Sequence, residues 1–182
     1  LSSIQEARDL AANAYEAWKI WSKASQEEVD RVVAAMAEAG YHASERLGRL
    51  AQEETGYGVA AHKKLKNEFG SRMVWESIRD LPTVGVIGHD PDRRVVEIAW
   101  PMGVVTALIP STNPTSTALF KALIAVKTRN AIVLSPHPSA VRCICETAQT
   151  LAMAAESAGA PKGLIGCLSQ VSLQGTQELM NH

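Results

Sequence analysis

Apolar residues in the first 80 positions recur at helical spacing, within segments rich in alanine and charged residues. No proline occurs before Pro82, so nothing here interrupts helical hydrogen bonding. The clearest helix starts at Ser25, which together with Glu28 has the pattern of a capping box. Its apolar stripe then follows at spacings of four and three: Val29, Val33, Met36, Gly40, Ala43, Leu47 and Leu50.

This stripe predicts one helix that ends at Thr55-Gly56, because glycine readily takes the left-handed conformation that closes a helix. Gly40 lies on the stripe, and two interpretations stay open for it. It either breaks the helix or allows close contact with another helix.

After Pro82 the pattern changes to short runs of β-branched residues. Two of these runs, 84–87 and 95–99, flank Asp90-Pro91-Asp92, which is a turn signal. They predict a β-hairpin. Because the runs alternate only weakly, both faces of the hairpin are fairly apolar. We therefore expect it to lie against a neighbouring subunit in a homo-oligomer.

The rest of the chain alternates between apolar runs and helical patterns. Buried strands are predicted at 103–109, 131–135 and 164–168. A helix is expected after each strand, at 115–129, 140–157 and 174–180. Repeated strand and helix is the order of a parallel sheet, and continuous apolar runs fit strands that are buried on both faces. The predicted fold class is α/β.

Composition and charge argue against several classes of partner. The chain has 182 residues, of which 46% are hydrophobic and 20% charged, with a formal net charge of −1. Its basic residues are scattered, so neither nucleic acid nor an anionic membrane surface is an expected partner. No apolar stretch is long enough to span a bilayer. A small ligand is the better expectation.

The three cysteines are expected to be small apolar core residues. Cys143 and Cys145 lie two positions apart in a predicted helix and should point in different directions, which argues against a shared metal site. Cys167 lies in a predicted buried strand. An odd number of cysteines fits free thiols in a reducing compartment, so we expect a cytoplasmic protein without a bound metal.

Two loops follow the predicted parallel strands, Pro110-Ser111-Thr112-Asn113-Pro114 and Ser135-Pro136-His137-Pro138. Ligands of open parallel sheets bind at the carboxyl ends of the strands, where such loops lie. Both loops carry hydroxyl or amide groups, and proline makes them rigid. No GxGxxG pattern follows either strand, which argues against an ordinary Rossmann pyrophosphate site.

The run PMGVVTALIPSTNPTSTALFKALIAVKTRNAIVLSPHPSA, residues 101–140, resembles the cofactor-domain signature of the aldehyde dehydrogenase superfamily. More narrowly, it is similar to the CoA-acylating acetaldehyde dehydrogenases. The resemblance covers nearly the whole chain: AWKIWSKASQEEVDRVV and EETGYG match the helical lead-in, and GAPKGLIGCLSQ matches the third strand.

The resemblance implies a division into three parts. Residues 1–82 would be the helical part of a cofactor domain, 83–100 an oligomerisation arm, and 101–182 a Rossmann-like cofactor-binding part. The implied cofactor is NAD or NADP, with CoA and a small aldehyde as substrates.

The resemblance assigns Asn113 to oxyanion stabilisation. In this family the asparagine of that loop donates its side-chain amide to the oxygen of the thiohemiacetal formed when a cysteine thiolate attacks the aldehyde. A fixed donor of this kind lowers the barrier by roughly 3 to 4 kcal/mol. The residues alone favour a different role, because an asparagine before a proline is typical of a helix N-cap.

The resemblance also assigns cofactor binding to both loops, at Ile109, Pro110, Ser111, Thr112, Ser135, Pro136 and His137. Hydrolytic members usually carry Lys-Pro after the second strand, whereas this chain has Ser135-Pro136 followed by His137. That departure is similar to the acylating members. An exposed loop histidine without a ligand stays the alternative for His137.

The nucleophilic cysteine is implied to lie beyond His182, so that residues 1–182 would be inactive alone. Two alternatives stay open. One is an enzyme similar to glutamyl-phosphate reductase, whose loop differs from STNPTS. The other is a catalytically silent domain that binds nucleotide or assembles through the hairpin. The aldehyde is not determined, and neither is NAD against NADP, because no acidic residue for a ribose hydroxyl is evident.

Overall fold

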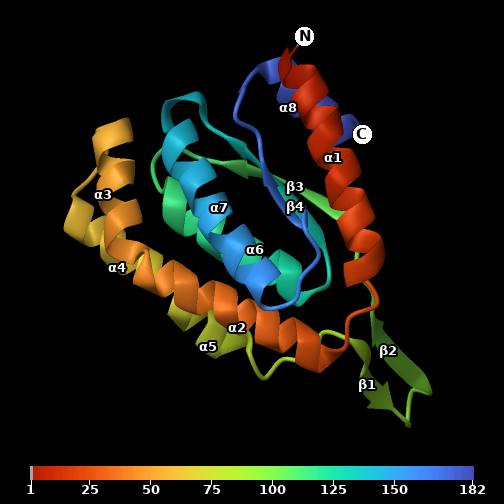
Figure 1. The fold of residues 1–182 in the computed structure, drawn as a ribbon. Helices are drawn as coiled ribbons and strands as arrows, with labels where there is room; N and C mark the ends of the chain where they lie inside the picture. Colours follow the sequence, from red (N-terminus) through yellow and green to blue (C-terminus); the bar gives the residue numbers. More distant parts are fainter. Residues whose placement is uncertain (1) are drawn as a thin grey trace.

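The first half of the chain folds into helices in the computed structural model, which describes residues 2–182 (Figure 1). These helices are α1 (Ser2–Trp21), α2 (Gln26–His42), α3 (Ser44–Thr55), α4 (Ala60–Glu68) and α5 (Val74–Ile78). A π-helical stretch, Phe69–Met73, joins α4 to α5. Within residues 2–182, no helix is long and apolar enough to cross a membrane.

The prediction of a single helix from Ser25 to Thr55 is wrong, because the chain bends at Ala43. The helix α2 has the expected capping box, in which Glu28 N–H donates to Ser25 Oγ over 3.2 Å and Ser25 N–H donates to the Glu28 carboxylate over 2.8 Å. At Ala43 the backbone (φ −81°, ψ −4°) leaves the regular helix. The next helix, α3, runs at an angle to α2 (Figure 1) and ends, as predicted, at Gly56 with φ 70°.

Gly40 allows a close helix contact and does not break α2. It is buried within the helix, and a Cβ atom there would lie 2.7 Å from Leu119 Cδ2 and 3.1 Å from Ser71 Cβ. Only glycine therefore lets α2 approach α6 (Pro114–Lys127) this closely without a shift of its neighbours.

The second half forms the predicted parallel sheet. Its strands are β3 (Val104–Ile109), β4 (Ala131–Pro136) and β5 (Ile165–Cys167), in the spatial order β3-β4-β5. The helices α6, α7 (Val141–Ser157) and α8 (Leu173–Asn181) follow these strands in turn. Every residue of β4 is buried, as expected for a strand that is covered on both faces.

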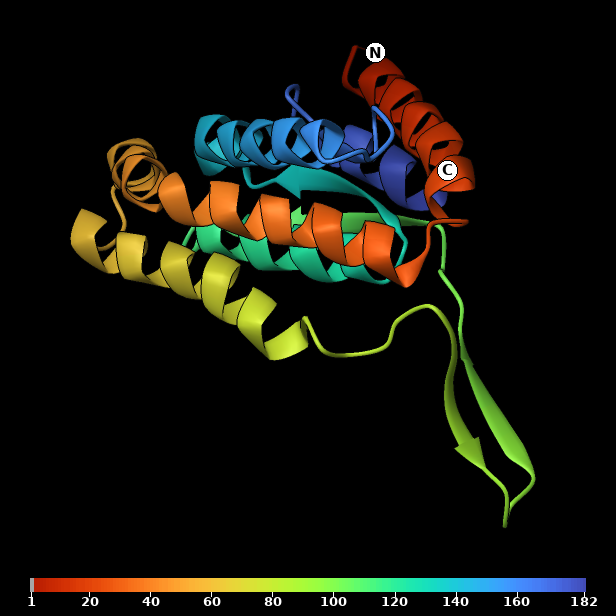
Figure 2. The ribbon, with the colours of Figure 1, turned by 60° about the horizontal axis from the view of Figure 1, so that its bottom comes forward.

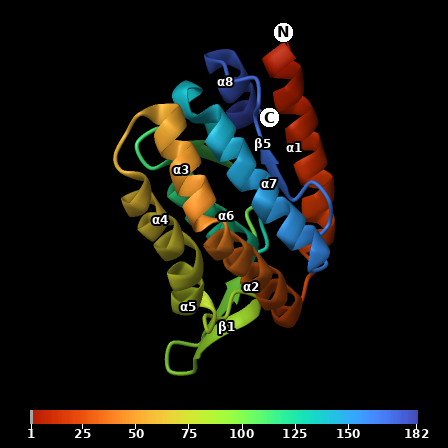
Figure 3. The ribbon, with the colours of Figure 1, turned by 60° about the vertical axis from the view of Figure 1, so that its left-hand side comes forward.

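Helices cover both faces of this sheet. On one face lie α1 and α8, and on the other lie α6 and α7 (Figure 1). The helix α2 packs on the outer side of α6 and α7, and α3 to α5 extend this outer layer (Figure 3). The N-terminal helices are thus part of the sheet domain and complete its core.

The predicted hairpin is confirmed as β1 (Gly85–Asp90) paired antiparallel with β2 (Val95–Ala99). It projects away from the helices and the sheet (Figure 2). At its base, the Arg129 guanidinium donates to the carbonyl of Ala99 over 3.2 Å and to that of Ser22 over 2.8 Å. These contacts attach the base of the hairpin to the body of the molecule.

Candidate functional site

The two loops singled out in the sequence lie side by side. Because β3 and β4 are parallel neighbours with Ile109 opposite Pro136, both strands end at the same edge of the sheet. The backbone N–H of His137 donates to the carbonyl of Ile109 over 2.9 Å and joins the two ends directly. This edge is where an open parallel sheet binds its ligands.

A cavity of about 460 Å³ opens between these strand ends and α8, and we call it the carboxyl-end cavity. Five predicted cofactor-binding residues line it: Ile109, Pro110, Ser135, Pro136 and His137. The other lining residues are Leu108, Pro138, Val171, Ser172, Leu173 and Thr176. Apolar walls with a few hydroxyl groups are typical of a site for a small molecule.

Local hydrogen bonds fix the polar groups of this cavity. Ser135 is buried, and its hydroxyl shares a hydrogen bond of 2.8 Å with the hydroxyl of Thr176, which ties α8 to β4. The exposed His137 ring accepts the Ser139 backbone N–H at Nδ1 over 3.2 Å. Nδ1 is therefore held by the following turn, and Nε2 is left to contact a ligand.

Asn113 lies immediately before α6, yet its side chain makes no capping hydrogen bond. The capping interpretation of this side chain is therefore wrong. The ammonium of Lys66 donates to Asn113 Oδ1 over 2.8 Å. With its oxygen occupied, the asparagine presents its Nδ2 amide as the donor that is left for a ligand.

Asn113 also lines a second hollow, which we call the Asn113 groove. Its volume is about 460 Å³, and it lies between the first turns of α6 and the helices that precede the hairpin. Its other lining residues are Lys66, Phe69, Gly70, Val74, Ser116, Thr117 and Phe120. An amide donor at the edge of a partly aromatic groove suits a small apolar substrate with one polar oxygen.

The helix α4 supports the loop that carries Asn113, and the sequence did not predict this support. Lys63 is buried, and its ammonium donates to the carbonyl of Thr112 over 3.1 Å. Burial lowers the pKa of Lys63, and the adjacent Lys66 ammonium lowers it further. Asn67, also buried, accepts from the Thr115 hydroxyl over 2.7 Å.

Two of the predicted cofactor-binding residues line neither of the two hollows. Ser111 and Thr112 line neither the carboxyl-end cavity nor the Asn113 groove.

The backbone amides that begin α7 are already hydrogen-bonded, because the Glu54 carboxylate accepts the N–H of Arg142 over 2.8 Å and that of Cys143 over 2.7 Å. This helix start is therefore closed to an anion.

Among residues 2–182, no cysteine lines either hollow. Cys143 is a core residue, as expected: it is fully buried, and its thiol donates to the carbonyl of Ala140 over 3.4 Å. Burial raises the pKa of Cys143 and keeps it protonated. Cys145 and Cys167 are only partly buried, which corrects the expectation that all three cysteines are core residues.

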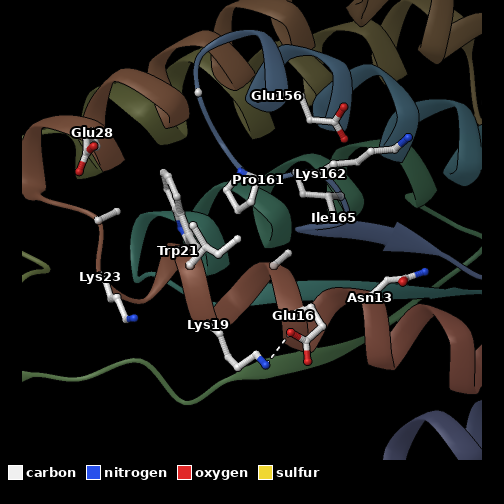
Figure 4. Close-up of a pocket in the computed structure, with 15 residues that line it drawn as sticks. Asn13, Glu16, Lys19, Trp21, Lys23, Glu28, Glu156, Pro161, Lys162 and Ile165 are labelled. Carbon is white, nitrogen blue, oxygen red and sulfur yellow. Dashed lines mark ion pairs between the residues drawn. The ribbon is translucent and has the colours of Figure 1, made fainter.

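A larger surface groove, about 1230 Å³, lies at the opposite edge of the sheet (Figure 4). It is bounded by the end of α1 and by the segment between α7 and β5, around Trp21, Pro161 and Ile165. Its charges are mixed, and one pair of them, Lys19 with Glu16, is already in contact over 2.5 Å. The groove contains none of the residues that the sequence assigned to cofactor binding or catalysis.

Comparison with known proteins identifies the class. Residues 2–182 match the model of the aldehyde dehydrogenase family, and the chain belongs to that family. The bifunctional aldehyde-alcohol dehydrogenase AdhE of Escherichia coli (strain K12) is 38% identical over 182 residues, which are all of this chain and 20% of that protein. The chain thus spans about a fifth of this relative's length.

Solved structures narrow the class to acylating enzymes. An acetylating aldehyde dehydrogenase from Geobacillus thermoglucosidasius superposes with a TM-score of 0.97 at 53% identity, covering all of this chain and 40% of that one. A propionaldehyde dehydrogenase from Rhodopseudomonas palustris, solved with bound CoA and an acylated cysteine, superposes with a TM-score of 0.81 at 26% identity, over 97% of this chain and 40% of that one. The resemblance to the acylating branch is confirmed.

Proposed function

We propose that this chain is the N-terminal cofactor-binding part of an acylating aldehyde dehydrogenase. The reaction converts an aldehyde, CoA and NAD(P)⁺ into acyl-CoA, NAD(P)H and a proton. The proposal is supported by the 38% identity of the chain to AdhE, by its 35% identity to the acetylating succinate-semialdehyde dehydrogenase of Clostridium kluyveri, and by the Asn113 groove.

The observation that carries the proposal is the pairing of Lys66 with Asn113 Oδ1 at 2.8 Å. It fixes the amide and leaves Nδ2 to donate to an oxyanion. Negative charge develops on the aldehyde oxygen when a thiolate adds to the carbonyl, and a fixed donor lowers that barrier by roughly 3 to 4 kcal/mol. The Lys66 ammonium adds positive charge next to the Asn113 amide.

The carboxyl-end cavity fits an adenine nucleotide, the portion that NAD(P) and CoA have in common. Its apolar residues Ile109, Pro136 and Val171 suit a flat ring, and the Nε2 atom of His137 suits a polar atom at the rim. A bound nicotinamide cofactor supplies the hydride acceptor for the reaction. The chain's own residues bind and orient the substrates.

The nucleophile is proposed to belong to a catalytic domain outside residues 1–182. None of the three cysteines lines the Asn113 groove, and Cys143 is held protonated by burial. We therefore expect residues 1–182 to form no acyl-CoA from acetaldehyde, NAD⁺ and CoA. Turnover by the purified chain would contradict this part of the proposal.

A chimera tests the role of Asn113. In it, residues 1–182 replace the matching part of the Geobacillus thermoglucosidasius enzyme, to which they are 53% identical. We expect Asn113→Ala to lower kcat of the active chimera about 100-fold to 1000-fold with little change in KM, since the amide acts on the developing oxyanion. The measurement is the rate of NADH formation at saturating CoA.

Asn13→Ala is the matched control, because Asn13 is an exposed asparagine on α1 at the opposite edge of the sheet. It should leave kcat unchanged. An Asn113→Ala chimera that retains the kcat of the parent chimera would exclude Asn113 as the oxyanion donor.

A further inference from the structure

Two cysteines that the proposed function does not use lie against each other. Cys145 on α7 and Cys167, the last residue of β5, are 22 positions apart in sequence, yet their sulfur atoms are 3.1 Å apart. Both are free thiols, and both are partly exposed. Helix and strand packing therefore brings two accessible thiols within hydrogen-bond distance.

The surroundings make the two thiols unequal. The hydrogen bond between the two thiols lowers the pKa of Cys145, although burial and the Glu6 and Glu54 carboxylates oppose this. The same hydrogen bond raises the pKa of Cys167, and burial raises it further. Since the thiolate is the reactive form, Cys145 is the nucleophile and Cys167 the resolving thiol.

We propose that Cys145 and Cys167 form a dithiol modification site that closes reversibly into a disulfide between α7 and β5. With a peroxide as oxidant, the Cys145 thiolate attacks one oxygen, becomes a sulfenic acid and releases water after protonation. The Cys167 thiol then displaces the sulfenic hydroxyl, a second water leaves, and the S–S bond forms. Two thiols lose two electrons in total, and one hydrogen peroxide is reduced to two waters.

The third cysteine offers a contrast within the same helix. Cys143 is fully buried, and its thiol is engaged with the Ala140 carbonyl, so it has neither access nor a partner thiol. Oxidation should therefore modify Cys145 and Cys167 and leave Cys143 as a free thiol.

The pair lies at the start of the segment that leads from β5 to the carboxyl-end cavity. The segment after β5 starts at Leu168, whose carbonyl lies 3.5 Å from Cys145 Sγ. Its next residue, Ser169, is held by the Glu6 carboxylate, which accepts the backbone N–H over 2.9 Å, and the segment then supplies Val171 and Ser172 to the cavity wall. A disulfide would form at the start of this segment. The dithiol proposal itself does not rest on the proposed function.

Thiol counting tests the proposal on the 182-residue chain. The reduced protein is treated with one equivalent of hydrogen peroxide or with a glutathione redox buffer, and free thiols are titrated under denaturing conditions. We expect the count to fall from three to one, and dithiothreitol to restore it. Peptide mass spectrometry should identify a Cys145–Cys167 cross-link in monomeric protein.

Variants provide the controls. Cys143→Ser should lose both remaining thiols, whereas Cys145→Ser and Cys167→Ser should form no intrachain disulfide. Phenylarsine oxide, which binds two adjacent thiols, gives a measurement that needs no oxidant: one equivalent should bind to the wild type and to Cys143→Ser but not to Cys145→Ser. A wild-type protein that keeps three thiols, cross-links through Cys143 or fails to bind the arsenical would overturn the proposal.

Discussion

Asn113 shows how far single residues can be interpreted from sequence. An asparagine between a strand and a proline predicts a helix cap as readily as a catalytic donor. The difference depends on Lys66, which is 47 positions away and reaches the asparagine oxygen only after α4 has packed beside the loop. The spacing of residues in the sequence therefore cannot predict the contact between Lys66 and Asn113. The structure excludes a capping role for the side chain, and the oxyanion role stays a proposal.

At the same scale, Val171 tests whether nucleotide binds in the carboxyl-end cavity. Val171→Trp adds a bulky ring to a cavity of about 460 Å³ and should exclude an adenine ring by volume. We expect NAD⁺ and CoA to bind the 182-residue chain at least about tenfold more weakly in this variant, measured by isothermal titration calorimetry.

The matched control is Ile20→Trp, since Ile20 is 65% exposed and lines the large groove at the opposite edge of the sheet. This variant should bind both ligands like the wild type. If Ile20→Trp abolishes binding and Val171→Trp does not, the nucleotide site is the large groove.

At the level of elements, the sequence predicted the strands and most helices well, because burial on both faces produces continuous apolar runs. It failed at Ala43 for a physical reason. Leu50 of α3 belongs to the same core as Val33 and Met36 of α2, and Leu47 is buried as well, so the apolar stripe continues through the bend. A periodic pattern records which side is buried, and it does not record a change of helix axis.

The helix α4 and the π-helical stretch were not resolved from sequence because their pattern is inverted. Lys63 and Asn67 are buried, whereas Leu65 and Phe69 are 61% and 63% exposed. The polar residues point inward because Lys63 binds the loop before α6 and Asn67 binds Thr115 in the first turn of α6. Sequence reasoning that places apolar residues inside therefore missed the element that supports Asn113.

Gly70 tests the contact between the π-helical stretch and α6. A Cβ atom at this buried position would lie 2.8 Å from the carbonyl oxygen of Ser116, a backbone atom in the first turn of α6. Alanine normally stabilises a helix by about 1 kcal/mol relative to glycine. We expect the steric clash to outweigh the gain in helix propensity, so that Gly70→Ala lowers the free energy of unfolding by about 1 to 3 kcal/mol. The measurement is equilibrium unfolding in urea.

Ala61→Gly in α4 is the control that measures the effect of helix propensity on the free energy of unfolding, because Ala61 is exposed. Its loss of about 1 kcal/mol should come from helix propensity alone. A Gly70→Ala protein more stable than the wild type would show that α6 is not in tight contact with this stretch.

At the scale of the whole molecule, the apolar hairpin requires an explanation. Val86 and Ile98 face each other across the two strands, and each is 62% exposed. Next to the hairpin, Trp100 and Met102 are 81% and 89% exposed. An arm that projects from the body with apolar side chains on its surface is typical of a surface that another subunit covers. The sequence predicted the arm, and the identity of its partner stays a prediction.

We predict that a second copy of the chain covers this arm. Replacing Val86 and Ile98 together by lysine puts two like charges opposite each other on the proposed contact surface, so association should be lost while the body stays folded. Sedimentation velocity should then give a smaller mass for Val86→Lys/Ile98→Lys than for the wild type, with an unchanged circular dichroism spectrum. Met153→Lys/Leu173→Lys, at residues 62% and 70% exposed outside the hairpin, is the control and should sediment like the wild type. If the wild type is monomeric at micromolar concentration, or if the hairpin variant keeps its mass, the exposed arm has another partner.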